Sequence, residues 1–195
     1  MQPAWRRYGI IPMLLVAGTI LGGSPSLARD SDGAWEFGGY AFTAKYDNSS
    51  KIDNTPGFGV RGAYHFKAER ELEIDYDRGT GDTTDTNLPG VTYDVTKYTV
   101  NYLRNFIVKG SEKMVPFLSF GAGKIRVDRS DLSESVDRTL LRVGGGFKYF
   151  FSPRIAFRLD LKGYRWRGDP PVTPAPSFFS FDATVGVAVL VGGGK

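Results

Sequence analysis

Apolar and polar side chains alternate with a period of two through most of the chain after Arg29. Successive side chains of a β-strand point to opposite faces, so this pattern predicts strands with one apolar face and one polar face. The clearest examples are the segments 58–66, 72–77, 141–149, 157–162 and 179–189. In these segments charged or small residues fill the positions between the apolar ones.

Three further segments alternate less regularly, namely 34–46, 93–107 and 115–127. Tyr40 and Phe42 interrupt the first, while Lys124 and Arg126 share the parity of apolar neighbours in the third, so their faces stay unassigned. The eight segments mark eight strands, each expected to be long enough to cross a bilayer when tilted, which takes about 9–11 residues. We therefore expect an all-β fold, an eight-stranded antiparallel up-and-down transmembrane β-barrel.

The connections between these segments differ in length. Long ones, rich in Asp, Asn, Ser, Thr, Gly and Pro, are 48–56, 79–91, 128–138 and 168–177. Short ones are 67–71, 109–114 and 152–154. Outer-membrane barrels have long loops outside the cell and short periplasmic turns. This places Thr86 at the cell surface, and Ala68 and both chain ends on the periplasmic side.

The first short turn sets the register of its two strands. If Phe66 and Leu72 both face lipid, parity requires an odd-numbered turn, and 67–71 has five residues. In this register His65 faces Glu73. Opposite charges on the same face of neighbouring strands are what a packed polar interior needs, because an unpaired buried charge is costly.

The polar faces together predict a network of charges inside the barrel. Arg61 is expected near Asp75 and Asp77. We expect the network to be structural rather than catalytic, and its members are Arg61, His65, Glu73, Asp75, Arg142, Arg158, Asp160 and Lys162.

Alternation alone is compatible with two kinds of barrel. A membrane barrel has its apolar face outward, and a soluble barrel has that face inward. Charges beside glycines on the polar faces, aromatic residues near strand ends and the alternating loop lengths favour lipid outside. The alternative is a lipocalin-like soluble barrel, because Gly33-Ala34-Trp35 matches a G-x-W tripeptide at a first strand. The strand pattern continues to Val191, however, which leaves no C-terminal helix of the lipocalin kind.

The N-terminal residues have the features of an export signal. Arg6 and Arg7 precede an apolar run, Ile10–Leu21, and a small-residue cleavage site, Ser26-Leu27-Ala28. A membrane anchor is the alternative, but this run is shorter than the roughly 20 residues that a spanning helix needs. We predict a signal peptide over 1–28 and an outer-membrane β-barrel domain over 29–195.

Composition excludes several kinds of site. Lys and Arg number 25 against 21 Asp and Glu, without a strongly basic segment, so nucleic acid is not an expected partner. The chain has no cysteine and one histidine, His65, which excludes disulfides, thiolate metal sites and His-rich clusters. We expect no cofactor and no metal.

Several segments resemble the outer-membrane protein β-barrel domain family, the small OmpA-like and OmpX-like barrels, over residues 33–191. The resemblance lies in 57–64 (GFGVRGAY), 115–123 (VPFLSFGAG), 141–146 (LRVGGG) and 157–164 (FRLDLKGY). It implies a Gram-negative outer-membrane barrel that contacts lipid and the barrel assembly machinery. Such barrels commonly end in an aromatic residue used in assembly, whereas this chain has Val189-Leu190-Val191 followed by Gly192-Gly193-Gly194-Lys195.

Three functional classes remain open from the sequence. The favoured one is a non-enzymatic envelope protein whose four surface loops recognise a ligand. A porin-like pore is the second, although eight strands leave an interior about filled by side chains. The third is a lipid-modifying enzyme, but His65, the only histidine base, lies near the short-turn side. Lys124 and Arg126 are candidates to contact lipopolysaccharide phosphates, with a solvated strand end as the alternative.

Overall fold

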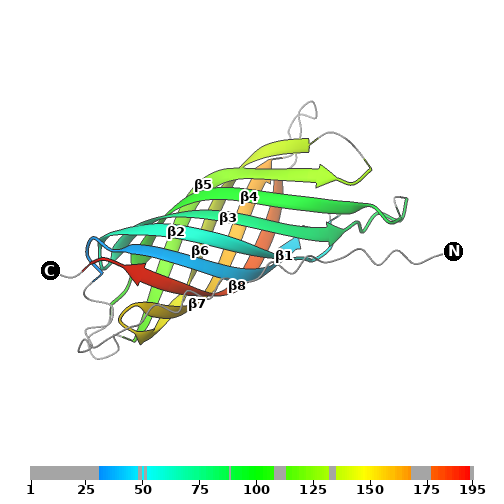
Figure 1. Cartoon of the computed structure of the whole chain (residues 1–195). Coiled ribbons are helices and arrows are strands. Elements are labelled where there is room, and N and C mark those ends of the chain that lie inside the picture. The colour runs from blue at the N-terminus through cyan, green and yellow to red at the C-terminus, as the bar shows by residue number, and fades with distance from the viewer. Residues whose placement is uncertain are drawn as a thin grey trace.

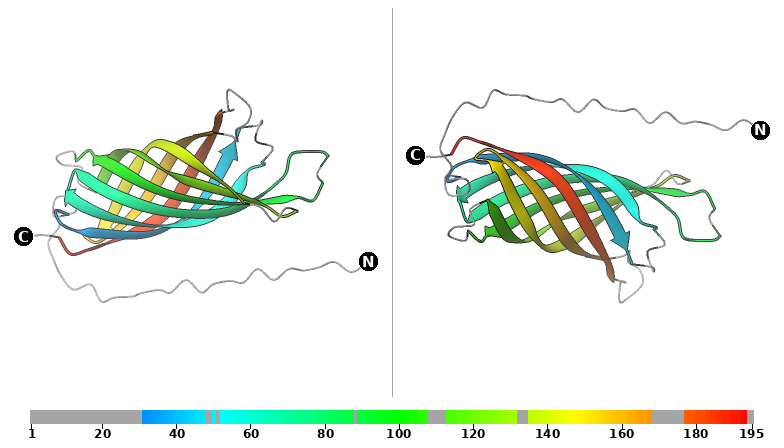
Figure 2. Two further views of the ribbon diagram at one scale, coloured as in Figure 1. Left: turned by 90° about the horizontal axis from the view of Figure 1, so that it is seen from above. Right: turned by 90° about the horizontal axis from the view of Figure 1, so that it is seen from below.

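The strands of the barrel follow one another around a ring in chain order. The computed structural model describes residues 31–47, 50, 52–87, 89–107, 113–131, 135–167 and 177–193. The strands are β1 (Trp35–Tyr46), β2 (Thr55–Lys67), β3 (Arg70–Asp82), β4 (Thr92–Asn105), β5 (Met114–Arg129), β6 (Ser135–Ser152), β7 (Ile155–Arg167) and β8 (Ser177–Val191). Each pairs antiparallel with the next, and β8 pairs with β1 to close the barrel (Figures 1 and 2). The predicted fold class is confirmed.

Closure is extensive at the seam between the first and last strands. The pairing of β1 with β8 runs from Trp35 opposite Val191 to Tyr46 opposite Ser180. A membrane offers no water to unpaired backbone groups, so a sheet that crosses it must have no free edge. The long seam meets this requirement. No helix in the described part of the chain is long and apolar enough to span a membrane.

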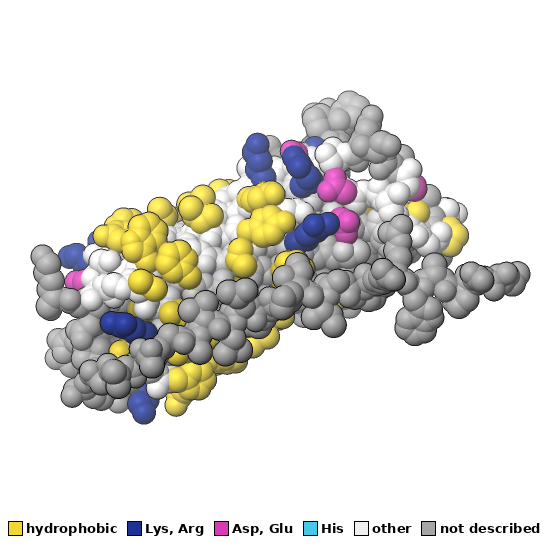
Figure 3. Space-filling model, in the orientation of Figure 1, with side chains coloured by type: hydrophobic (Ala, Val, Ile, Leu, Met, Phe, Trp, Pro, Cys, Tyr) yellow, Lys and Arg dark blue, Asp and Glu magenta, His cyan; other side chains and the backbone are white. Residues whose placement is uncertain are grey.

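Apolar side chains cover most of the outer face of the barrel. Exposed fractions reach 71% for Leu161, 66% for Val143 and 65% for Phe181. Figure 3 shows hydrophobic side chains gathered on the wall of the barrel, with Lys and Arg side chains towards both ends of this band. A water-soluble barrel would bury these side chains, so the lipocalin-like alternative is wrong.

The structure assigns the three segments that alternation left open. In β1 the even-numbered residues point inward, so Tyr40 and Phe42 lie inside the barrel beside Glu36. In β4 and β5 the odd-numbered residues point inward. Lys124 and Arg126 consequently lie on the outer wall.

The turn between β2 and β3 is tighter than expected. It comprises residues 68–69 instead of 67–71, and a bulge in β2 between His65 and Lys67 shifts the register. The extra residue keeps both Phe66 and Leu72 outward, as parity requires. It also moves His65 opposite Glu71 rather than Glu73, so the expected register is wrong by two residues.

Other connections between strands also differ in length from the predicted ones. β3 and β4 extend into the expected loop 79–91 and leave 83–91, while β5 and β6 leave 130–134 of the expected 128–138. The connection between β4 and β5, expected as a short turn at 109–114, spans 106–113. We call the end of the barrel with the connections 68–69, 106–113 and 153–154 the inner end, and the opposite end the outer end. The predicted signal peptide, 1–28, lies outside the described residues.

The outward position of Leu161 gives a test of the lipid-facing wall. Leu161→Arg should destabilise the barrel folded in lipid vesicles by about 2–4 kcal/mol, because an arginine near the bilayer midplane on the lipid face is costly. Urea unfolding of the lipid-embedded protein measures this difference, with Leu161→Ala as the control. An unchanged midpoint for Leu161→Arg would contradict the assignment of the outer face.

The orientation of the barrel is testable with single cysteines, because the chain has none. Thr86, exposed at the outer end, should react as Thr86→Cys with a membrane-impermeant maleimide on intact cells. Ala68 is buried and is a poor probe of the inner end, so exposed Arg154 replaces it. Arg154→Cys should react only after the outer membrane is permeabilised. The reverse labelling pattern would invert the barrel.

Candidate functional site

The middle of the barrel interior holds a layer of charged side chains. The eight residues expected there are all buried, namely Arg61, His65, Glu73, Asp75, Arg142, Arg158, Asp160 and Lys162. They come from β2, β3, β6 and β7, the strands with the cleanest alternation. The structure brings seven of them into direct ion pairs with one another. His65 lies in an adjoining group, which the ion pair between Glu36 and Arg158, at 3.5 Å, joins to the first.

Arg158 is the centre of the larger group. Its Nε donates to Asp160 Oδ1 at 2.8 Å, and its Nη1 donates to Glu73 Oε2. Arg61 Nη1 donates to the other oxygen of Asp160 at 2.9 Å. The guanidinium of Arg158 also lies 4.5 Å above the ring centroid of Phe117. Each acid in this group therefore has at least one positive partner, which buried charges require.

Asp75 links the group to β6 and to the rest of β7. Arg142 Nη1 donates to Asp75 Oδ2, and Lys162 Nζ donates to the same oxygen at 3.3 Å. Lys162 Nζ also lies 3.7 Å from Asp160 Oδ2. Arg61 stands opposite Asp75 in the sheet register, but its guanidinium forms ion pairs with Asp160 and Glu73. The backbone of Arg61 thus lies next to that of Asp75, as expected, while the side chain of Arg61 extends across the barrel to Asp160.

His65 belongs to a cluster of four residues nearer the inner end. Its Nε2 lies 3.1 Å from Glu36 Oε2 and 3.0 Å from Glu71 Oε2. Lys148 Nζ donates to the same two carboxylates, at 2.6 Å to Glu36 Oε2 and 2.8 Å to Glu71 Oε2. The expected partner Glu73 is replaced by Glu71 because of the bulge in β2.

The geometry of Glu36, His65 and Glu71 alone would suit a metal ion, since their ligand atoms lie within 4.8 Å of one another. Two carboxylates and an imidazole are also a common donor set for divalent cations. However, the ammonium group of Lys148 already binds both carboxylates. A metal ion would have to displace this internal cation, so the donor set does not fit a resident metal.

Several members of the charged layer were not expected from the sequence. Glu71 was placed in a turn, and Glu36 lies in the segment whose face Tyr40 and Phe42 had obscured. Lys148 was on a recognised polar face, so its position gave the signal that it belongs to the interior. Lys97 and Asp182 form a further buried ion pair, and Lys97 Nζ lies 3.8 Å from Asp77 Oδ2.

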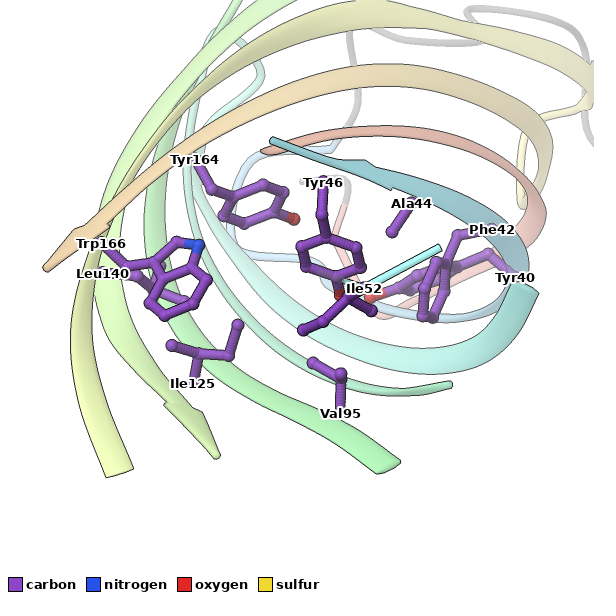
Figure 4. Packing of buried hydrophobic residues seen from close by; sticks show 10 residues of the cluster. All are labelled: Tyr40, Phe42, Ala44, Tyr46, Ile52, Val95, Ile125, Leu140, Tyr164 and Trp166. Carbon is purple, nitrogen blue, oxygen red and sulfur yellow. The ribbon is translucent and has the colours of Figure 1, made fainter. Parts of the chain in front are cut away.

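Towards the outer end the interior holds an apolar layer, and Figure 4 shows its side chains inside the barrel. Its buried members are Tyr40, Phe42, Ala44, Tyr46, Ile52, Val95, Ile125, Leu140, Tyr164 and Trp166, and we call them the apolar plug. The interior of this half of the barrel is therefore largely apolar, and several of these residues come from the segments whose faces the sequence left unassigned. The inward face of β1 is aromatic here, which explains why its alternation was difficult to read.

Aromatic rings of the apolar plug rest directly on the charges below. Arg61 Cζ lies 4.0 Å and Lys162 Nζ 4.7 Å from the ring centroid of Tyr40. Such cation–π contacts stabilise cations that are removed from water. Gly59 makes room for this ring, because a Cβ at that position would lie 2.5 Å from Tyr40 Cζ. The two layers are therefore packed against each other as one unit.

The contacts of His65 do not form a nucleophile–base pair. In the described part of the chain its ring is hydrogen-bonded to carboxylates, and no hydroxyl group donates to it. A catalytic triad of the hydrolase kind needs a hydroxyl or thiol in contact with the histidine. The buried histidine therefore serves as a partner of Glu36 and Glu71 in this structure.

The two basic residues considered for lipopolysaccharide differ in their surroundings. Arg126 makes a two-point contact with Asp137, from Nε to Oδ1 at 2.7 Å and from Nη2 to Oδ2 at 3.0 Å. Lys124 lies on the outer wall opposite Thr139 of β6. The guanidinium of Arg126 is thus already engaged by a carboxylate of its own chain.

Solved structures of other proteins have a similar architecture. The Neisserial surface protein A is 18% identical, with a TM-score of 0.62, and 81% of this chain and 99% of that chain are covered. OprG from Pseudomonas aeruginosa is 12% identical, with a TM-score of 0.62 and coverage of 85% and 99%. Ail, the attachment invasion locus protein of Yersinia pestis, is 17% identical, with a TM-score of 0.54 and coverage of 82% and 99%.

These identities are low, so the three likenesses show a shared fold. No curated protein matches the sequence. The model of the outer membrane protein beta-barrel domain family matches residues 14–188, most of the chain. Together with the closed eight-stranded barrel and its lipid-facing wall, this match shows that the chain belongs to the outer membrane protein β-barrel domain family.

Proposed function

We propose that this protein is a non-enzymatic, non-conducting protein of the bacterial outer membrane. The barrel serves as a rigid anchor, and the outer end with its four connections carries out recognition. The observation that supports this proposal is that two layers of side chains fill the interior, the charged layer and the apolar plug. Recognition then falls to the surface connections, which is where scaffold proteins usually bind their ligands.

The charged layer has a structural role in this proposal. Its ion pairs join β1, β2, β3, β6 and β7 across the barrel, over sequence separations as large as that between Glu36 and Arg158. A conducting pore would need a continuous path of water past these side chains, whereas an eight-stranded barrel has room for little beyond its own side chains. The charged layer therefore stabilises the barrel by linking strands on opposite sides of it.

Export and insertion complete the proposal. Residues 1–28 direct the chain across the inner membrane and are removed, and the barrel assembly machinery inserts the remainder. The outer wall then contacts lipid, and the ligand of the surface loops is a molecule outside the cell. Western blotting of fractionated cells with N-terminal sequencing of the membrane form tests the cleavage after Ala28.

A planar-bilayer recording tests the absence of conduction. Refolded protein should insert without producing discrete current steps, because the charged layer and the apolar plug block the interior. Heat-denatured protein in the same buffer controls for leakage caused by detergent. Reproducible single-channel steps of one amplitude from the folded protein alone would overturn the proposal in favour of a pore.

Replacing one arginine in each of two settings tests the structural role of the charged layer. Arg158→Leu should reduce the free energy of unfolding by about 3–5 kcal/mol, because it leaves buried carboxylates without their partner. Arg126→Leu removes an exposed ion pair and should cost about 1 kcal/mol or less. Urea unfolding in lipid vesicles gives both values. Similar losses for the two variants would contradict a bracing role for the interior network.

A further inference from the structure

His65 of β2 belongs to a closed ring of contacts with side chains of three other strands. Its Nε2 lies 3.1 Å from Glu36 Oε2 of β1 and 3.0 Å from Glu71 Oε2 of β3. Lys148 Nζ of β6 contacts the same two oxygen atoms, at 2.6 Å and 2.8 Å. Each of these oxygen atoms thus contacts two nitrogen atoms, and each nitrogen atom contacts two oxygen atoms. We call these four residues the His65 cluster.

The His65 cluster is shielded from water. None of its side chains is more than 2% exposed. Phe150 lies two residues after Lys148 on β6, towards the inner end, and belongs to a buried apolar group. The members of that group are Ala34, Val115, Phe150, Ala156 and Leu190. Charges in such a place have to be balanced by neighbouring side chains, because water does not reach them.

The other cations near the His65 cluster already serve other acids. Arg158 Nη1 of β7 lies 3.5 Å from Glu36 Oε1. The same guanidinium is hydrogen-bonded more closely to Asp160 and Glu73. Arg61, further along β2, forms ion pairs with these same two acids. Within the cluster itself, two carboxylates therefore face one lysine.

The remaining strands bring no charge to the His65 cluster in the described part of the barrel. Asn105 of β4 is neutral, and its Nδ2 lies 3.4 Å from Glu71 Oε2, to which it donates. Val115 of β5 and Leu190 of β8 stand opposite cluster members in the sheet register, and both are apolar. The second positive charge of the cluster can therefore come only from His65.

The interior as a whole lacks the same single positive charge. Among the described residues its buried acids are Glu36, Glu71, Glu73, Asp75, Asp77, Asp160 and Asp182. Its buried Lys and Arg side chains are Arg61, Lys97, Arg142, Lys148, Arg158 and Lys162. The acids thus outnumber these bases by seven to six, and a protonated His65 would make the two numbers equal.

The contacts of the imidazole agree with this charge count. A lone pair on Nε2 would face lone pairs of two carboxylate oxygens, so Nε2 carries a proton. Nδ1 has no hydrogen-bond partner in the described structure, so a second proton there is stabilised by the charge of the imidazolium beside two carboxylates.

We propose that the folded barrel binds this second proton near neutral pH and that the proton makes the stability of the barrel depend on pH. His65 is then an imidazolium, and the His65 cluster alternates two positive with two negative groups. The proton joins β2 to β1, the strand of the seam, and to β3. The proposal does not depend on conduction or on a ligand of the surface connections.

The direction of the pH dependence follows from the unfolded chain, where an exposed histidine has a pKa of about 6.5. Above about pH 7 the unfolded chain therefore binds fewer protons at His65 than the folded barrel does, and stability falls as the pH rises. Below about pH 6 both states are protonated, and the stabilisation is fully present. One linked proton changes the equilibrium constant for unfolding by up to about tenfold per pH unit.

Nuclear magnetic resonance can observe the proton directly, because the chain has one histidine. The full chain is labelled with nitrogen-15 in histidine and refolded in detergent micelles at pH 7.5. Both ring nitrogens should have the chemical shifts of an imidazolium. The same chain unfolded in urea at this pH is the control, and its imidazole should be mostly neutral.

Variants at position 65 connect the proton to stability. Urea unfolding in lipid vesicles is measured at pH 7, 8 and 9. From pH 7 to 9 the wild-type equilibrium constant for unfolding should rise by up to about tenfold per unit relative to that of His65→Gln. His65→Lys keeps a positive charge over this range, so it should be as insensitive to pH as His65→Gln and more stable than it. Arg154→Gln, at an exposed position of the inner end, should follow the wild type.

Three results would overturn the proposal. A neutral imidazole in the folded barrel at pH 7.5 would place the balancing proton on a carboxyl group instead. A wild-type stability that is constant from pH 7 to 9 would show that no proton is linked to folding. An equal loss of stability in the wild type and in folded His65→Gln would assign the pH dependence to other groups, and His65→Lys provides this comparison if His65→Gln does not fold.

Discussion

The seam between β1 and β8 is the constraint on which the rest of this structure depends. Once the sheet is closed, every backbone group in the membrane has a partner, and lipid can cover the entire wall. Closure also separates the interior from the outside. Outward positions then favour apolar side chains, while inward positions form a narrow space where each polar group must find its partner within the barrel. The distribution of side chains follows from this division.

The interior meets this requirement by pairing and by layering. In the described part of the barrel, seven buried carboxylates face six buried Lys and Arg side chains. His65 lies against two of the carboxylates, at a place where one more positive charge would make the numbers of buried positive and negative charges equal. The apolar plug lies above most of these charges, whereas Lys97 and Asp182 lie at its level, opposite Ile125 and Ala44 in the sheet register. Tyr40 belongs to both layers, because its ring contacts Arg61 and its hydroxyl donates to Asp77. Packing and electrostatics thus support each other along the axis of the barrel.

The same division determines where function is located. A filled interior leaves the outer wall, the rim and the surface connections as the places that meet other molecules. At the rim the lipid-facing parity of the strands continues, but the medium changes from hydrocarbon to charged headgroups.

The amino-acid sequence by itself determined the strands, their number and the two faces of the five clearest segments. These properties are local, because alternation records which medium each side chain meets. The eight residues expected in the interior, from Arg61 to Lys162, were found on the same basis. Tertiary structure alone decided which charges pair. The bulge in β2 exchanged Glu73 for Glu71 as the partner of His65, and Arg61 reaches Asp160 across the barrel, although the two are 99 residues apart in the chain. It also decided that Tyr40 and Phe42 turn inward, where glycines of β2 and β8 leave room for their rings.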